Sequence, residues 1–78
     1  MTNIYSSEDI ANRIRERAKA QGKTHKVLLK ESSLGINTIS NIHSGKDILT
    51  LNFAKIADAL DCSVDYLLGR TDNPEINR

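Results

Sequence analysis

The spacing of apolar residues constrains this chain more than any other feature of its sequence. Apolar side chains recur three or four positions apart along much of its 78 residues, and strand-type alternation is nowhere sustained. A spacing of three to four places side chains on one face of an α-helix. Glycines and polar residues divide the pattern into five short segments. The sequence therefore predicts an all-α fold, a compact five-helix bundle with one modest core and no roomy active-site cavity.

Residues that commonly cap helices mark where these segments begin and end. Ser or Thr at an N-cap accepts a hydrogen bond from a free backbone N–H, and glycine favours the left-handed conformation that ends many helices. The expected N-caps are Ser6 or Ser7, Thr24, Thr50 and Ser63, and the expected ends include Gly22, Gly45 and Gly69. These signals predict helices over approximately residues 8–21, 26–32, 36–44, 51–60 and 64–68.

The same spacing predicts which side chains form the core. They are Ile10, Ile14 and Ala18; Val27 with Leu28 or Leu29; Ile39 and Ile42; Leu51, Phe53, Ala54, Ile56, Ala57 and Leu60; and Val64 and Leu67. Residues 1–69 are expected to form one domain. Residues 70–78 contain the only proline and little that can be buried, so we expect a mobile C-terminal tail.

Charge is distributed unevenly, although the net formal charge is only +1. Residues 1–46 contain eight Lys or Arg and four acidic residues, whereas residues 47–78 contain three basic and six acidic residues. A basic half beside an acidic half indicates a side that faces a polyanion. The alternative is that these charges belong to ordinary solvated helix faces.

Several classes of protein are disfavoured by the sequence. The single cysteine, Cys62, excludes an intramolecular disulfide and is expected to be a small buried side chain. Neither His25 nor His43 has Cys, Asp or Glu at metal-ligand spacing, so no metal or other cofactor is expected. Enzyme motifs, a long apolar run and a signal-peptide profile are absent from the sequence. We therefore expect a cytoplasmic, non-enzymatic protein without a membrane segment or a small-molecule ligand.

Residues 26–44 contain the pattern that points to a function. The helices expected over 26–32 and 36–44 are joined by about three residues, as in a helix-turn-helix. The second helix of that motif enters the major groove of B-DNA, where asparagine can contact N6 and N7 of adenine together. Asn37 and Asn41 lie four residues apart and therefore share one helix face. They either read bases or are merely exposed polar residues.

Four stretches resemble the helix-turn-helix domain of the phage-repressor family of transcription regulators (Cro/C1-type, XRE-like). They are RIRERAKAQGKTH (13–25), NTISNIHSGK (37–46), LNFAKIADALDCSVD (51–65) and YLLGRTD (66–72). The resemblance implies a five-helix domain of the lambda-repressor-like DNA-binding type, with the helix-turn-helix at its second and third helices. It also implies a homodimer on a near-palindromic operator, and the small contact surface predicts weak dimerisation in solution.

The resemblance implies roles for individual residues. The residues that would read DNA bases are Ile36, Asn37, Ser40 and Asn41, and those that would contact the DNA backbone are His25, Lys26, Gly35, Lys46, Thr50 and Asn52. Ile36 would touch a thymine methyl group or would help to form the core. Tyr66 and Leu68 would lie at the two-fold dimer contact, because burial of Val64 and Leu67 leaves Tyr66 or Leu68 exposed.

The chain departs from the family pattern at a few positions. Late in the first helix, relatives often have Leu followed by Arg, and the Arg pairs with a Glu near the end of the third helix. This chain has Arg17-Ala18 and His43 instead, so that ion pair is not expected. Leu29 replaces a small residue in the second helix, which predicts a changed helix angle or register. Ser33 occupies the position of the usual turn glycine.

Two functions from different classes fit this sequence. The first is a sequence-specific double-stranded-DNA-binding transcription regulator, specifically a repressor. The second is a protein-interaction module, such as an antitoxin-like element or the target of an anti-repressor, that uses the same helical fold to bind a protein partner. The exposed face of residues 36–44 discriminates between them, because its asparagines matter for DNA only in the first case.

Overall fold

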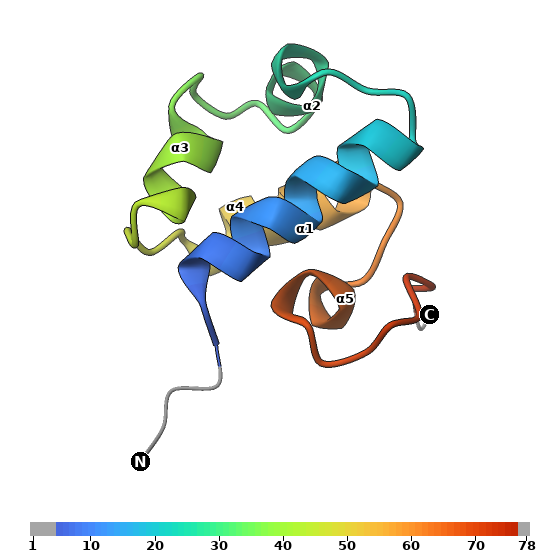
Figure 1. Ribbon diagram of the computed structural model, residues 1–78. Coiled ribbons are helices and arrows are strands. Elements are labelled where there is room, and N and C mark those ends of the chain that lie inside the picture. Colours follow the sequence, from blue (N-terminus) through green and yellow to red (C-terminus); the bar gives the residue numbers. More distant parts are fainter. Residues whose placement is uncertain (1–4, 77–78) are drawn as a thin grey trace.

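The computed structural model describes residues 5–76, which contain five α-helices joined by short connections (Figure 1). In chain order the helices are α1 Ser7–Ala20, α2 His25–Glu31, α3 Thr38–His43, α4 Thr50–Ala59 and α5 Val64–Leu68. No β-strand occurs among the described residues. The predicted all-α class and the five helices are therefore confirmed. None of these helices is both long enough and apolar enough to cross a membrane.

Local capping chemistry explains most of the helix boundaries. The side chains of Ser6, Thr24 and Ser63 accept hydrogen bonds from the backbone N–H groups three residues later, at 3.3, 3.2 and 3.0 Å. Each of these bonds satisfies a donor that the helix itself leaves free. Gly22 and Gly69 have φ angles of +70° and +83°, which allows the chain to reverse after α1 and α5. These predicted caps and ends are confirmed.

Two predicted helix starts were wrong by one or two residues. The N-cap of α4 is Leu49, and Thr50 is already the first helical residue. Helix α3 begins at Thr38, because its hydroxyl and its N–H both bond the carbonyl oxygen of Gly35, at 2.7 and 3.1 Å. These bonds form a tight turn before α3. Ile36 and Asn37 therefore belong to the turn rather than to the first turn of the helix.

The core is formed by side chains from all five helices around the long helix α1. Figure 1 shows α1 crossing the middle of the molecule, with α4 behind it and α2, α3 and α5 around it. Fully buried residues include Ile14, Leu28, Ile56, Leu60 and Leu67, and Ile39 and Ile42 bury the inner face of α3. Burying a side chain of this size contributes about 1.5–3 kcal/mol relative to exposure. This core fixes α3 with its polar face outward.

Two residues predicted for the core are exposed instead. Val27 is 43% exposed and Leu51 is 76% exposed. In α2, both Leu28 and Leu29 are buried, so the buried face is centred on them and Val27 lies at its side. In α4, a rotation of about 100° per residue places Leu51 on the face opposite the buried Phe53. The apolar stripe of α4 is therefore narrower than the sequence pattern indicated.

Ser33 adopts a backbone conformation that normally favours glycine. Its φ is +56° in the connection between α2 and α3. The left-handed region costs an L-residue roughly 1–2 kcal/mol, whereas glycine pays no such steric cost. Glycine at position 33 would remove this cost. Part of the resulting stabilisation would be offset, because glycine has more conformational freedom in the unfolded chain.

Ser33→Gly is expected to raise the free energy of unfolding by about 0.5–1 kcal/mol, and Tm by roughly 2–8 °C. Thermal unfolding followed by circular dichroism measures the change. The matched control is Ser40→Gly, where the same substitution within α3 is expected to destabilise the protein, because glycine is a poor helix former. Equal effects of the two substitutions would show that the conformation of Ser33 is not strained.

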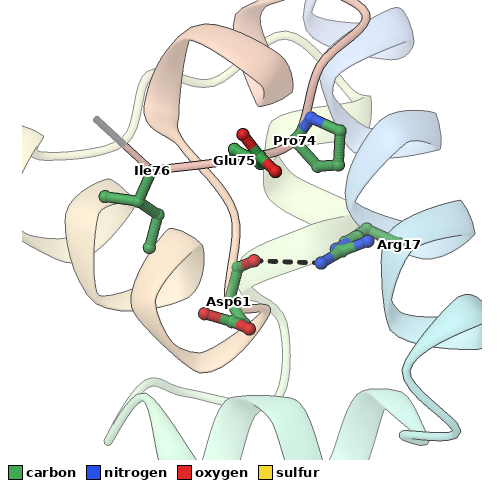
Figure 2. A pocket seen from close by; sticks show the side chains of 5 residues that line it. All are labelled: Arg17, Asp61, Pro74, Glu75 and Ile76. Carbon is green, nitrogen blue, oxygen red and sulfur yellow. Dashed lines mark hydrogen bonds between the residues drawn. The ribbon is translucent and has the colours of Figure 1, made fainter. Parts of the chain in front are cut away.

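The C-terminal end of α4 is held by basic side chains from the α1 region and by the C-terminal segment. Arg17 donates hydrogen bonds from Nε to the Leu60 carbonyl oxygen (3.0 Å) and from an η-nitrogen to the Asp61 carbonyl oxygen (2.9 Å). Figure 2 shows this second bond, with Pro74 and Glu75 beside it in the same small pocket. The N–H of Ser63 donates to the Pro74 carbonyl oxygen at 2.9 Å. Part of the predicted tail therefore contacts the α4–α5 connection.

Candidate nucleic-acid interface

The outer face of α3 and the residue before it carry exposed polar side chains whose hydrogen-bonding groups are unused. Asn37, Ser40 and Asn41 are all exposed. Their side chains form no hydrogen bond with any other residue that the structure describes. The neighbouring hydroxyls of Thr38 and Ser44 behave differently, because they bond the carbonyl oxygens of Gly35 and Asn41 at 2.7 and 2.9 Å. The polar row formed by Asn37, Ser40 and Asn41 is therefore available to an external ligand.

The inner side of α3 holds this row in a fixed orientation. Ile39 and Ile42 are buried, and α3 packs against α1. Asn37 is the N-cap residue, but its side chain does not cap the helix. The side-chain amide of Asn37 therefore has no hydrogen-bonding role in the described fold. Asn37 directly precedes α3, and its carbonyl oxygen accepts a hydrogen bond from the N–H of Asn41 at 2.9 Å.

Most of the residues predicted to contact a DNA backbone are exposed. His25 and Lys26 begin α2, Gly35 lies before α3, Lys46 lies between α3 and α4, and Thr50 begins α4; all five are exposed, and Asn52 is half-buried. Neither Lys26 nor Lys46 forms an ion pair with another described residue. A Cβ atom added to Gly35 would meet nothing within 4 Å, so the backbone there is open to close approach.

The N-terminus of α4 presents donors of its own. Its N-cap residue Leu49 has no side-chain acceptor, and no side chain caps the helix. The first backbone bond of this turn runs from the N–H of Phe53 to the Leu49 carbonyl oxygen, at 2.9 Å. The three preceding amides, including those of Thr50 and Asn52, are left free in the described structure. Such amides and the positive end of the helix dipole favour an anion such as phosphate.

Several of the basic residues in the first half of the chain have structural partners instead. Arg17 bonds the end of α4, and Arg15 donates to Asn12 Oδ1 at 3.3 Å. Lys23 forms an ion pair with Glu31 at 3.0 Å and also donates to the Ala59 carbonyl oxygen. Part of the positive charge of residues 1–46 is therefore used in contacts within the protein. For Arg17, the sequence signal of an unusual role was the order Arg17-Ala18, where relatives often have Leu followed by Arg.

His43 occupies the position where relatives often have Glu, and it faces a different partner. Its Nε2 lies 3.9 Å from Oε1 of Glu8, in the first turn of α1. Ala18 is buried in the core. His43 and Glu8 therefore form an exposed contact between the end of α3 and the first turn of α1. A pair of this kind contributes little to stability.

The two residues predicted for a dimer contact are less exposed than expected. Tyr66 and Leu68 are both half-buried and pack against the core. The expectation that one of them would be exposed was wrong, because α5 lies against both α1 and α4 and so has two sides covered. Their remaining surface is small.

Cys62 behaves as the sequence predicted. It is 1% exposed, and burial raises the pKa of its thiol. A buried thiol with a raised pKa is little ionised near neutral pH and is therefore a weak nucleophile. Within residues 5–76, no three side chains of the metal-binding types lie close enough to hold a metal ion.

Comparison with known proteins finds similarity to a phage transcriptional repressor. The chain is 36% identical, over 62 residues, to the cryptic phage CTXphi transcriptional repressor RstR of Vibrio cholerae serotype O1. The similarity covers 78% of this chain and 55% of that protein, so the chain spans about half the length of the relative it matches. No family model matches the sequence. The similarity supports a relationship to phage repressors, in line with the resemblance carried by the four stretches.

Proposed function

We propose that this chain is a sequence-specific double-stranded-DNA-binding regulator of transcription, a repressor, with α2 and α3 as its helix-turn-helix. The observation that supports this most is the polar row of Asn37, Ser40 and Asn41, which is exposed and has no partner within the described structure. Base edges in the major groove offer donors and acceptors that suit such side chains. The similarity to a phage transcriptional repressor favours the same function.

In this proposal, Ile36 and the polar row read the bases, and residues on both sides of α3 grip the DNA backbone. His25 and Lys26 at the start of α2 would contact phosphates on one side. On the other side, Lys46 and the free amides near Thr50 and Asn52 would do so. Backbone contacts of this kind fix the register of a protein on DNA, whereas base contacts provide specificity.

The proposed active form is a homodimer on a near-palindromic operator in the cytoplasm. Two protomers would place their α3 helices roughly 34 Å apart, one turn of B-DNA. The contact would use the half-buried Tyr66 and Leu68. Because their exposed surface is small, we expect dimerisation to be weak in solution and to be strengthened by binding of two adjacent half-sites.

Selection from a random duplex library tests the proposal directly. We expect a near-palindromic consensus, bound at least about 10³-fold more tightly than random DNA. Fluorescence anisotropy at several salt concentrations should show log affinity falling linearly with log salt. Lys26→Gln and Lys46→Gln should each reduce the slope by about 1, whereas Lys19→Gln, in the last turn of α1, where this proposal places no phosphate contact, should not.

Absence of any consensus, with operator and random duplexes bound equally, would contradict the proposal. The protein-interaction alternative would then be the better description of the exposed α3 face. A consensus whose salt slope is unchanged by both substitutions would instead contradict only the assignment of Lys26 and Lys46 as phosphate contacts.

A further inference from the structure

Two large apolar side chains at the start of α4 are exposed to solvent. Leu49 is 74% exposed and Leu51 is 76% exposed, and only Thr50 separates them. Among the described residues, the other apolar side chain exposed to this extent is Ile36, which borders a groove beside α2 and belongs to the surface proposed to read bases. A single exposed apolar residue needs no explanation, whereas adjacent ones form an apolar patch that does. Leu49 and Leu51 are called the leucine pair below.

Leucine is an unfavourable residue at the N-cap of α4. Leu49 cannot accept a hydrogen bond through its side chain, and leucine is among the poorest N-cap residues, whereas α1, α2 and α5 begin with a capping Ser or Thr. Free amides for phosphate binding would explain the missing cap, but alanine would leave them equally free. They do not explain a large apolar side chain. Position 49 therefore gives up local stability for a leucine that the single chain leaves in water.

The leucine pair adjoins the surface already proposed for the dimer contact. Ile48, which directly precedes Leu49, is half-buried and lines a small pocket of about 200 Å³ together with Phe53 and Leu68. Leu68 is one of the two residues proposed to contact the second protomer, but it is itself half-buried. The leucine pair supplies the exposed apolar side chains that this contact lacks.

The charges on either side of the leucine pair suit a second copy of the same surface. Asp47 and Lys55 are exposed and form no ion pair with a described residue. They lie four residues before and four residues after Leu51. In a two-fold contact the same patch is used by both protomers, so groups on opposite sides of the axis face each other. With Leu51 at the axis, Asp47 of each protomer faces the partner's Lys55.

We infer that the leucine pair, flanked by Asp47 and Lys55, forms a two-fold interface with a second copy of this chain. The leucines of both protomers form the apolar centre, and the two exposed charge pairs set the orientation more than the affinity. Four leucines make a small contact, which fits a dimer that is weak in solution. The inference rests on the proposed homodimer, and it places most of the contact at the start of α4 rather than on α5.

Sedimentation velocity over a series of protein concentrations tests the interface without DNA. The double variant Leu49→Ala/Leu51→Ala removes four leucine side chains from each dimer, so we expect the dissociation constant of the dimer to rise at least about tenfold. Both positions are exposed, and the variant should therefore fold normally. Ile36→Ala is the matched control, because it removes a similarly exposed side chain elsewhere, and it should leave the dissociation constant unchanged.

Disulfide trapping detects the contact even where the dimer is too weak for sedimentation. Leu51→Cys places one thiol of each protomer near the two-fold axis, and diamide oxidises the two thiols to a disulfide while it is reduced to the hydrazine. The natural Cys62 is 1% exposed, so the parent protein should remain monomeric on a denaturing gel. We expect Leu51→Cys to cross-link at least about tenfold faster than Ile36→Cys, because association raises the local thiol concentration.

Binding to half-site and full-operator duplexes separates this interface from a direct contact with DNA. The double alanine variant should bind a single half-site as the parent does and should bind the full operator about tenfold more weakly, because the two protomers no longer assist each other. Equal losses on both duplexes would mean that the leucines touch DNA, and would overturn the inference.

Failure of the interface and failure of the proposed function give different results. If selection yields no operator but the double alanine variant weakens the dimer, the DNA-binding function fails and the interface stands. If the variant leaves dimerisation unchanged, or if Leu51→Cys cross-links no faster than Ile36→Cys, the interface is wrong and operator binding is unaffected by that result.

Discussion

Replacing Arg17 with methionine is expected to lower the free energy of unfolding by about 2–3 kcal/mol, and Tm by roughly 10–20 °C. The half-buried guanidinium donates to the carbonyl oxygens of Leu60 and Asp61 at 3.0 and 2.9 Å. These carbonyls lie at the C-terminal end of α4, where the helix dipole favours a positive charge. Methionine keeps much of the apolar stem but removes both donors, so chemical and thermal unfolding should report the loss directly.

Two further variants make this test specific. Arg17→Lys keeps the charge but cannot offer the planar fork of donors, so we expect an intermediate loss of stability. Arg15→Met removes a half-buried arginine from the same helix, whose side chain bonds only Asn12 among the described residues, at 3.3 Å. This substitution should change stability by no more than about 0.5 kcal/mol. If Arg15→Met and Arg17→Met destabilise equally, the contribution is that of a solvated charge and not of the α4 contact.

The difference between Arg17 and Ser6 shows what the sequence could and could not predict. The caps Ser6, Thr24 and Ser63 were predicted correctly, because a cap depends on residues only three positions apart. The partners of Arg17 are 43 and 44 residues away along the chain. No local pattern encodes such a contact, so the sequence indicated only a generally basic α1.

Side-chain exposure shows the same limit. The helical spacing identified most of the core, yet it included Leu51, because periodicity gives the centre of an apolar face more reliably than its edges. The polar face of α3 was predictable, since it follows from the identity and spacing of its own residues. The exposure of Ile36 was not, because it depends on the turn that Thr38 forms with Gly35 and on the groove beside α2.

Asn37, just before α3, and Asn41, within it, provide the sharpest test of base reading. Asn37→Ala and Asn41→Ala are each expected to weaken binding to the selected operator by about 1–3 kcal/mol, which is roughly 5- to 150-fold, and to relax specificity at one base position. Binding to random DNA and the salt slope should be unchanged, because neither side chain carries charge. Anisotropy titrations with operator and random duplexes measure both quantities.

Unfolding measurements and a modified DNA base distinguish loss of base reading from a general effect of each substitution on the protein. Neither asparagine side chain bonds another described residue, so unfolding of both variants should stay within about 0.5 kcal/mol of the parent. Asn73→Ala, in the C-terminal segment that Figure 1 shows on the side of the molecule away from α3, should not affect DNA binding.

A modified base tests the contact from the DNA side. If an asparagine bonds adenine N6 and N7 together, the protein should lose affinity when 7-deazaadenine replaces that adenine, whereas the affinity of the alanine variant should not change. Equal losses on operator and random DNA would mean that the asparagines support binding without reading bases.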